Sequence, residues 1–213
     1  MDLGLVIALA VNELTAPMTV GYILCAIGLA VHFGFTGLLN FGQAAFAALG
    51  AYGFGYAALV FQWDLWASVL FGLFCSMVFA ALLGIPTLRL RADYLAIVTI
   101  AASQALRFTL GSSTATPITG GSSGQNGFGE SFFALSPIDP DTVLQVGPVI
   151  LYSQDLWVRI VGWSLVVVAA LLVLVLTRSP WGRVLKGIRE DEDAVRALGK
   201  NVFSYKLQAL VLG

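Results

Sequence analysis

Long apolar runs that contain almost no basic residues are the feature that most limits how this 213-residue chain can fold. No Lys or Arg occurs before Arg89, and only Arg107 and Arg159 lie between Asp93 and Arg178. Apolar residues make up 58% of the chain and charged residues 11%, against about 45–50% and about 25% in soluble domains. A soluble domain needs charged surface throughout. The runs therefore predict an all-α, polytopic helical membrane protein.

The lengths of the runs predict how often the chain crosses a bilayer, since one helical span needs about 20 mostly apolar residues. Residues 3–11 are too few and are expected to form an interfacial turn or a short helix. About five complete spans are expected, at 18–35, 41–61, 66–88, 94–110 and 157–176. Another apolar run begins after Tyr205 and is too short to cross. We therefore expect the start of a sixth span and a C-terminally incomplete protein.

The basic residues predict the orientation of the chain in the membrane. The stretch 178–206 holds seven of the eleven basic residues, and the short turn 89–93 holds two more. The segment 111–156 has no Lys or Arg but carries four acidic residues. Because basic loops stay in the cytoplasm, 89–93 and 178–206 are predicted to be cytoplasmic and 111–156 external. The N-terminus is then outside if 41–61 crosses fully, and inside if that segment is re-entrant.

The predicted span 41–61 is rich in glycine, and two interpretations of it remain open. Ala47, Ala51 and Gly55 lie four residues apart and would allow two helix backbones to approach closely. Alternatively, the helix is broken near Asn40 and Gln43, and the freed backbone groups line a transport path. The two interpretations are compatible with each other.

The usual motifs of catalysis, metal binding and nucleotide binding are absent from the sequence. There is no G-x-x-x-x-G-K-[ST] motif, so the chain is not expected to bind ATP by itself. His32, the single histidine, has no Cys or His near it, which argues against a metal or triad role. There is no basic stripe of the kind that binds nucleic acid. The glycine-rich segment 119–127 is either a flexible external turn or a set of backbone anion nests.

The cytoplasmic segment 179–199 predicts one or two short helices outside the membrane. Ser179 suits an N-cap, Pro180 the first helical position and Gly199 the position after the helix end. An apolar stripe falls mostly on helical spacing, at Trp181, Val184, Leu185, Ile188, Val195 and Leu198. Acidic residues 190–193 interrupt it. Such a stripe packs either on a partner protein or on the chain's own cytoplasmic face.

Three blocks of the sequence resemble the membrane subunits of branched-chain amino acid ABC transporters of the Liv type. The blocks are Gly37–Tyr52, Leu88–Ile100 followed by the Thr119-Gly-Gly-Ser loop, and Gly182–Gly199. Their order and spacing extend the resemblance over about residues 17–213, and it is closer to the M-like than to the H-like subunit.

The resemblance implies partners and a place in the cell. Residues 1–213 would form a partial permease domain of a bacterial inner-membrane importer, with an external loop 111–156 and a cytoplasmic coupling segment 178–204. The implied partners are a second permease subunit, two ATP-binding cassette ATPases and an extracytoplasmic substrate-binding protein. ATP and Mg²⁺ would bind to the ATPases, and this chain would hold no cofactor or metal and would not be an enzyme. The implied cargo is a branched-chain, hydrophobic amino acid.

Two sets of functional residues follow from the residue pattern and the resemblance together. The substrate path is predicted at Asn40, Phe41, Gly42, Gln43 and Thr99. Coupling to the ATPases is predicted at Trp181, Arg183, Leu185, Ile188, Arg189, Glu190, Leu198 and Gly199. Closure of the ATPases would move the helix in 179–199 and rock open the path around 37–52.

Two alternative functions remain open at this point. Asn40 stands where many M-like members have Ser, and related permeases carry urea and short amides, so such a cargo is an alternative. An ion-gradient-driven carrier or channel is another, although it would need a titratable relay within the membrane. Only Glu13, His32, Asp93 and two arginines are available for a relay. An intramembrane enzyme lacks any constellation of catalytic residues.

Overall fold

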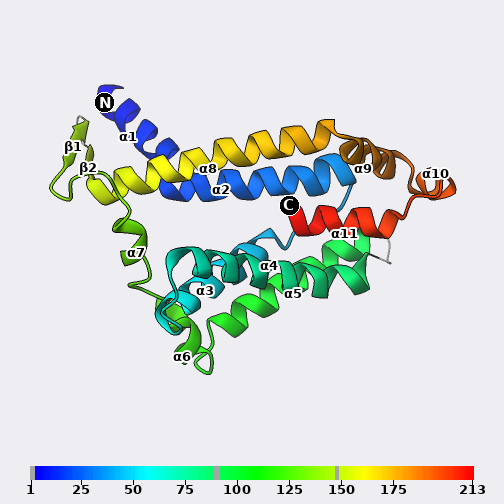
Figure 1. Ribbon diagram of the computed structural model, residues 1–213, viewed down its shortest axis with the longest axis horizontal. Coiled ribbons are helices and arrows are strands. Elements are labelled where there is room, and N and C mark those ends of the chain that lie inside the picture. Colours follow the sequence, from blue (N-terminus) through cyan, green and yellow to red (C-terminus); the bar gives the residue numbers. More distant parts are fainter. Residues whose placement is uncertain (1–2, 89–91, 147–148) are drawn as a thin grey trace.

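The chain is almost entirely helical in the computed structural model, which describes residues 3–88, 92–146 and 149–213 (Figure 1). The first elements are α1 (Leu3–Thr15), α2 (Pro17–Leu29), η1 (Ala30–Thr36, a π-helix), α3 (Gln43–Leu59), α4 (Leu65–Thr87) and α5 (Ala92–Leu110). They are followed by α6 (Thr116–Thr119), η2 (Gly121–Ser123), α7 (Glu130–Phe133), β1 (Val143–Val146) and β2 (Val149–Tyr152). The last are α8 (Ser153–Arg178), α9 (Pro180–Glu190), α10 (Glu192–Ala197) and α11 (Val202–Leu212). The predicted helical membrane class is confirmed.

The helices lie close to the predicted spans. Three of those in the described residues are long and apolar enough to cross a membrane: α2 with η1 (Pro17–Thr36), α4 and α8. The other two predicted spans correspond to α3, with 17 residues, and α5, with 19. Part of the predicted cytoplasmic turn 89–93, residues 89–91, lies outside the described residues. The N-terminal run forms α1, a short helix as expected.

Helices α3 and α4 form an antiparallel pair in close contact through small residues. A Cβ atom built on Gly72 would lie 2.6 Å from the Gly50 carbonyl oxygen, and one built on Gly53 would lie 3.0 Å from Cys75 Sγ. Of the predicted stripe, Ala47 and Ala51 are exposed and Gly55 packs against Gln125, so these residues do not face α4. The residues that face α4 include Gly50 and Gly53. Small-residue packing is therefore present, but on a different face of α3.

Helices α2 and α8 run side by side as a second group (Figure 1). Gly162 of α8 allows this approach, since a Cβ there would lie 3.0 Å from Val20 Cγ1. At the end near α1, Arg159 donates hydrogen bonds to the Asn12 carbonyl at 3.1 Å, to Asn12 Oδ1 at 2.8 Å and to Thr15 Oγ1. Arg159 therefore fixes the corner between α1 and α2.

The predicted external loop 111–156 contains short elements that the sequence did not predict. Strands β1 and β2 pair antiparallel, with Val143 opposite Tyr152. Thr119 Oγ1 donates to the Leu110 carbonyl at 2.7 Å, and Gln125 Nε2 donates to the Ile118 carbonyl at 2.7 Å. Gln125 also packs against Gly55, where a Cβ would lie 2.1 Å from Gln125 Oε1. The loop is thus joined to the C-terminal parts of α3 and α5.

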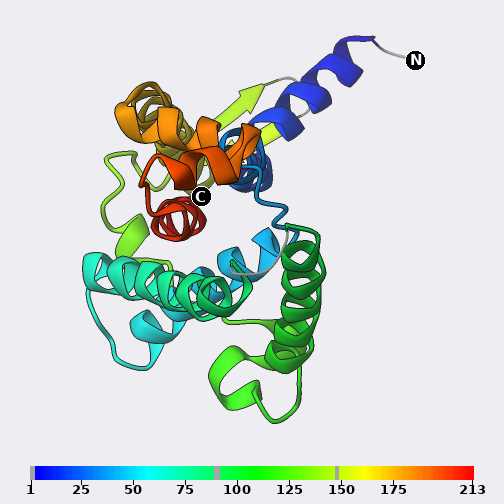
Figure 2. The same cartoon turned by 90° about the vertical axis from the view of Figure 1, so that its right-hand side faces the viewer.

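The hydrophobic core lies at the opposite end, where α9, α10 and α11 meet the longer helices. Helix α11 lies between the α2–α8 group and α4 (Figure 2). The core consists of Val31, Leu38, Leu88, Leu95, Leu185, Ile188, Val195, Val202, Ala209 and Leu210. Because these side chains come from seven separate parts of the chain, the core holds the predicted cytoplasmic segment against the spans.

Candidate functional site

The helical structure is interrupted between η1 and α3. Helix η1 ends at Gly37, which has φ +71°, and the Leu38 amide donates to the His32 carbonyl at 2.9 Å. Residues 38–42 are not helical. These residues connect the predicted spans 18–35 and 41–61, and α3 runs without interruption from Gln43 to Leu59, so the helix is interrupted at the start of the predicted span 41–61 and not within it. Whether the break lines a transport path is a separate question of function.

A buried cluster of polar groups supplies hydrogen bonds to backbone N–H groups that the break leaves without helical partners. The Phe41 amide donates to Thr99 Oγ1 at 3.2 Å, and the Gly42 amide donates to Asn40 Oδ1 at 2.9 Å. Asn40 Nδ2 lies 3.2 Å from His32 Nδ1. Asn40, His32 and Thr99 are each no more than 2% exposed. Two backbone N–H groups that the break frees are thus bonded within the chain, which a membrane interior requires.

The predicted path residues are largely brought together by this cluster. Asn40, Gly42, Gln43 and Thr99 are in or beside it, and Gln43 Nε2 donates to the Gly213 carbonyl at 2.8 Å. A Cβ on Gly42 would lie 2.9 Å from the Thr99 carbonyl oxygen, so the site requires glycine. The Phe41 side chain, by contrast, is exposed.

His32 is the member of the cluster that sequence reasoning missed, because that reasoning considered it only for metal, triad and titratable-relay roles. Helical spacing could not relate His32 to Asn40, eight residues later, because the helix ends between them. Its Nε2 atom is buried and has no hydrogen-bond partner within the described residues. No group of three or more His, Cys, Asp or Glu side chains in that part of the chain could hold a metal ion.

The predicted coupling segment forms two helices, α9 and α10, as expected. Gly199 has φ +74° and follows the end of α10, which confirms its predicted role. Ser179 occupies the N-cap position but does not cap the helix, because its hydroxyl donates to the Leu176 carbonyl at 2.6 Å. The predicted N-cap position of Ser179 is therefore confirmed, without a side-chain hydrogen bond to α9.

The apolar stripe of this segment is divided between the interior and the surface. Leu185 is fully buried and Ile188 is 4% exposed, and both belong to the core, so this part of the stripe packs on the chain's own helices. Leu198 is 78% exposed. Trp181 is half-buried and donates from Nε1 to Gln208 Oε1 at 2.9 Å. Arg183, Arg189, Glu190 and Gly199 are exposed.

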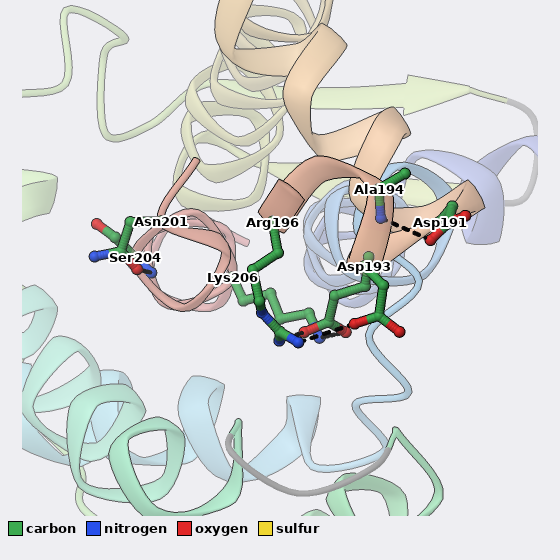
Figure 3. Close-up of polar contacts among 8 residues, drawn as sticks. Asp191, Asp193, Ala194, Arg196, Asn201, Ser204 and Lys206 are labelled. Atoms are coloured by element: carbon green, nitrogen blue, oxygen red, sulfur yellow. Dashed lines mark hydrogen bonds and ion pairs between the residues drawn. The ribbon is translucent and has the colours of Figure 1, made fainter. Parts of the chain in front are cut away.

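Ion pairs organise the surface around α10 (Figure 3). Arg196 pairs with Glu192 at 2.8 Å and with Asp193 at 2.9 Å, while Lys206 of α11 pairs with Glu192. The Asp191 carboxylate accepts a hydrogen bond from the Ala194 amide at 2.9 Å and caps α10. The pairs of Arg196 lie within α10 and are exposed, so they contribute little stability. The pair between Glu192 and the largely buried Lys206 joins α10 to α11.

Arg189 connects the two sets of predicted residues. Its guanidinium donates to the Gly34 carbonyl and pairs with Glu190. A Cβ on Gly37 would lie 3.0 Å from Arg189 Cγ, so the first residue after η1 is in contact with α9. Helix α9 therefore touches the chain where the break begins.

Comparison with known proteins places this arrangement in a family. The family model described as "Branched-chain amino acid transport system / permease component" matches residues 14–213. The chain belongs to this family. The match includes the helix break, the α3–α4 pair and the α9–α10 segment. It also confirms the resemblance that the three sequence blocks indicated.

The relatives in this family are permease proteins. The chain is 34% identical over 206 residues to the high-affinity branched-chain amino acid transport system permease protein LivM of Salmonella typhimurium. It is 32% identical over 218 residues to the LivM protein of Escherichia coli. Both alignments cover 92% of this chain and 48% of the relative, so the chain spans about half the length of these relatives.

A more distant relative is the probable branched-chain amino acid transport permease protein LivM of Methanocaldococcus jannaschii. It is 24% identical over 228 residues, which is 90% of this chain and 60% of the relative. No solved structure matches the chain significantly.

Proposed function

We propose that this chain is part of the membrane-spanning permease subunit of an ABC importer for branched-chain amino acids in a bacterial inner membrane. The observation that carries the proposal is the family match over residues 14–213. The chain provides a path and a mechanical connection, and it performs no bond chemistry. ATP and Mg²⁺ bind to two separate ATPase subunits.

The complex proposed around it contains a second permease subunit, the two ATPases and an extracytoplasmic substrate-binding protein. Within residues 1–213, a partial permease domain, the loop 111–156 is external and faces the binding protein. The segment 178–204 is cytoplasmic and faces an ATPase. The antiparallel pairing of α3 with α4 supports a full crossing by 41–61, which puts the N-terminus outside.

The contacts of α9 suggest how ATPase closure reaches the path. Exposed groups of the segment, Arg183, Glu190 and Leu198 among them, are available to an ATPase. Leu185 and Ile188 are buried and transmit the movement of α9 to the core residues Leu38 and Leu95. Arg189 transmits it to Gly34 and Gly37 at the start of the break.

Uptake measurements test the cargo and the energy source together. Cells with the intact gene and its partners are expected to accumulate radiolabelled leucine, and not urea, in an ATP-dependent manner. The ATPases are expected to co-purify with the permease. Accumulation of urea and not of leucine would show that the cargo is urea. Leucine uptake that an ionophore abolishes at constant ATP would indicate a gradient-driven carrier.

Thiol labelling tests the proposed orientation. A cysteine at Ser123, which is exposed in the loop, is expected to react with an impermeant reagent outside intact cells. A cysteine at Lys186, exposed on α9, is expected to react only after the cells are opened. Labelling of Lys186→Cys in intact cells would reverse the proposed topology.

A further inference from the structure

A cavity of about 470 Å³ lies between α3 and α5, beside the helix break. Ala44, Ala48 and Tyr52 line it from α3, and Ser103, Leu106 and Arg107 line it from α5. On each helix these positions are three or four residues apart and therefore share one face. The volume falls in the range of small-molecule sites, about 300–1,000 Å³.

Three polar side chains of the described residues border this cavity: Tyr52 and Ser103, which are half-buried, and Arg107, which is exposed. Within residues 3–88, 92–146 and 149–213, no hydrogen bond or ion pair joins the side chain of Tyr52, Ser103 or Arg107 to another residue. This contrasts with Arg159, the other arginine within an apolar run, whose guanidinium is bonded to Asn12 and Thr15. An ionisable group in a membrane helix normally has a partner or marks a path.

The chemistry of the lining fits one kind of ligand. A guanidinium is the side chain best suited to bind a carboxylate through two parallel hydrogen bonds. Hydroxyl oxygens such as those of Tyr52 and Ser103 accept hydrogen bonds from an ammonium group. The remaining wall, with Ala44, Ala48 and Leu106, is apolar and accommodates an aliphatic side chain.

The position of the cavity connects it with the helix break. Ser103 lies one turn after Thr99 on α5, and Ala44 follows Gln43 directly at the start of α3. One end of the cavity therefore adjoins the buried cluster of Asn40, Gln43 and Thr99. At the other end, Arg107 is in the last turn of α5, which leads to the predicted external loop.

We infer that the α3–α5 cavity is a substrate subsite in which Arg107 binds the α-carboxylate of an aliphatic amino acid. Tyr52 and Ser103 accept hydrogen bonds from its ammonium group, and Ala48 and Leu106 contact its side chain. This inference rests on the proposed function and assigns the residues that recognise the cargo within the membrane.

Protection of a cysteine in the cavity tests the subsite directly. The full-length permease, assembled with its partners and with Cys25 and Cys75 changed to alanine, carries Ala48→Cys as a reporter. Leucine at about ten times its Kd is expected to slow the reaction of this cysteine with a small thiol reagent about tenfold, because the unoccupied fraction of the site falls as the ratio of leucine concentration to Kd rises. Leucinamide, which has the same side chain and no carboxylate, is expected to give little protection.

Changes at Arg107 identify the group responsible. Arg107→Gln is expected to abolish protection by leucine, and Arg107→Lys to retain part of it, since Lys binds a carboxylate as a point charge. Gln104→Ala, at an exposed position that does not line the cavity, is the matched control and is expected to leave protection unchanged. If Arg107→Gln fails to accumulate, the comparison of leucine with leucinamide is made in the reporter protein with Arg107 unchanged. That comparison shows whether the ligand carboxylate is required for protection.

The outcomes separate this inference from the proposed function. The subsite is overturned if leucine is taken up but does not protect Ala48→Cys, or if leucinamide protects equally well. Either result leaves the permease function in place. Protection that persists in Arg107→Gln overturns the role of Arg107. Absence of leucine uptake in the parent complex overturns the proposed function and the subsite with it.

Discussion

The helix break at 37–42, which connects η1 to α3, and the α9–α10 segment, which connects α8 to α11, satisfy their polar groups in opposite ways. At the break, Asn40 and Thr99 are buried and bond to backbone amides of the same chain. Around α10, charged side chains pair with one another at the surface and leave Leu198 exposed. The break is here called the closed region, because its polar groups bond within the chain. The surface around α10 is called the open region, because it has exposed groups available to another protein. The difference separates residues that shape the chain from residues that can meet a partner.

Leu185→Asp is expected to have the largest effect. Leu185 lies in the α9–α10 segment but is fully buried, like Asn40 and Thr99 at the break. An aspartate at a position with no exposed surface would cost more than about 4 kcal/mol of stability. The abundance of the permease in membranes, measured by immunoblot, should fall to near zero. Arg183→Asp, on the same helix but exposed, is the control and should accumulate normally. Normal abundance of Leu185→Asp would show that this side chain is not packed inside the fold.

Gly42→Leu tests the closed region. The added side chain would collide with the Thr99 carbonyl, and overpacking of this kind costs roughly 1–3 kcal/mol or more. Leucine uptake at equal expression should be strongly reduced, and the melting temperature of the purified complex should fall. Ala170→Leu, which adds the same bulk at an exposed position of α8, should leave both unchanged. Equal uptake by the two variants would contradict a tight contact at the break.

Leu198→Asp tests the open region with the same chemical change as Leu185→Asp. Because Leu198 is exposed, the abundance of the permease should not change. Loss of a contact in an interface usually costs about 1–4 kcal/mol when the residue is central to it. Recovery of the ATPase in a pull-down should therefore drop by about tenfold. Full recovery would remove Leu198 from the proposed ATPase surface.

Arg196→Ala is expected to have the smallest effect. Its pairs with Glu192 and Asp193 are exposed, and pairs of this type contribute about 0–1 kcal/mol. The thermal stability of the complex should change little at low salt and not at all at high salt. A large loss of stability that salt does not reduce would mean that α10 is held by more than these surface pairs.

The sequence predicted the helices well because each apolar run is a local signal. The run at 157–176, for example, lies within α8 (Ser153–Arg178). The break was also accessible, since Gly37, Asn40 and Gly42 disfavour a continuous helix. The hairpin β1–β2 was missed because its strands have only four residues each.

Contacts between distant segments were the part that the sequence could not supply. The face of α3 that meets α4 depends on the rotation of both helices, so Ala47 and Ala51 were chosen in place of Gly50 and Gly53. The apolar spacing of α9 was correct, but it cannot distinguish burial against the same chain from burial against a partner. Only the fold shows that Leu185 and Ile188 are inside and Leu198 is outside.

The hydrogen bonds of Arg159 have a mechanical consequence for the whole molecule. They pin α8 to the α1–α2 corner at one end, while the other end of α8 continues through Ser179 into α9. With 26 residues, α8 is about 39 Å long, and about 29 Å of it lies beyond Arg159. Under the proposed coupling, a movement of α9 would act at the end of α8 that is far from Arg159. The displacement would be greatest at α9, beside Gly37, and smallest at the corner that Arg159 holds.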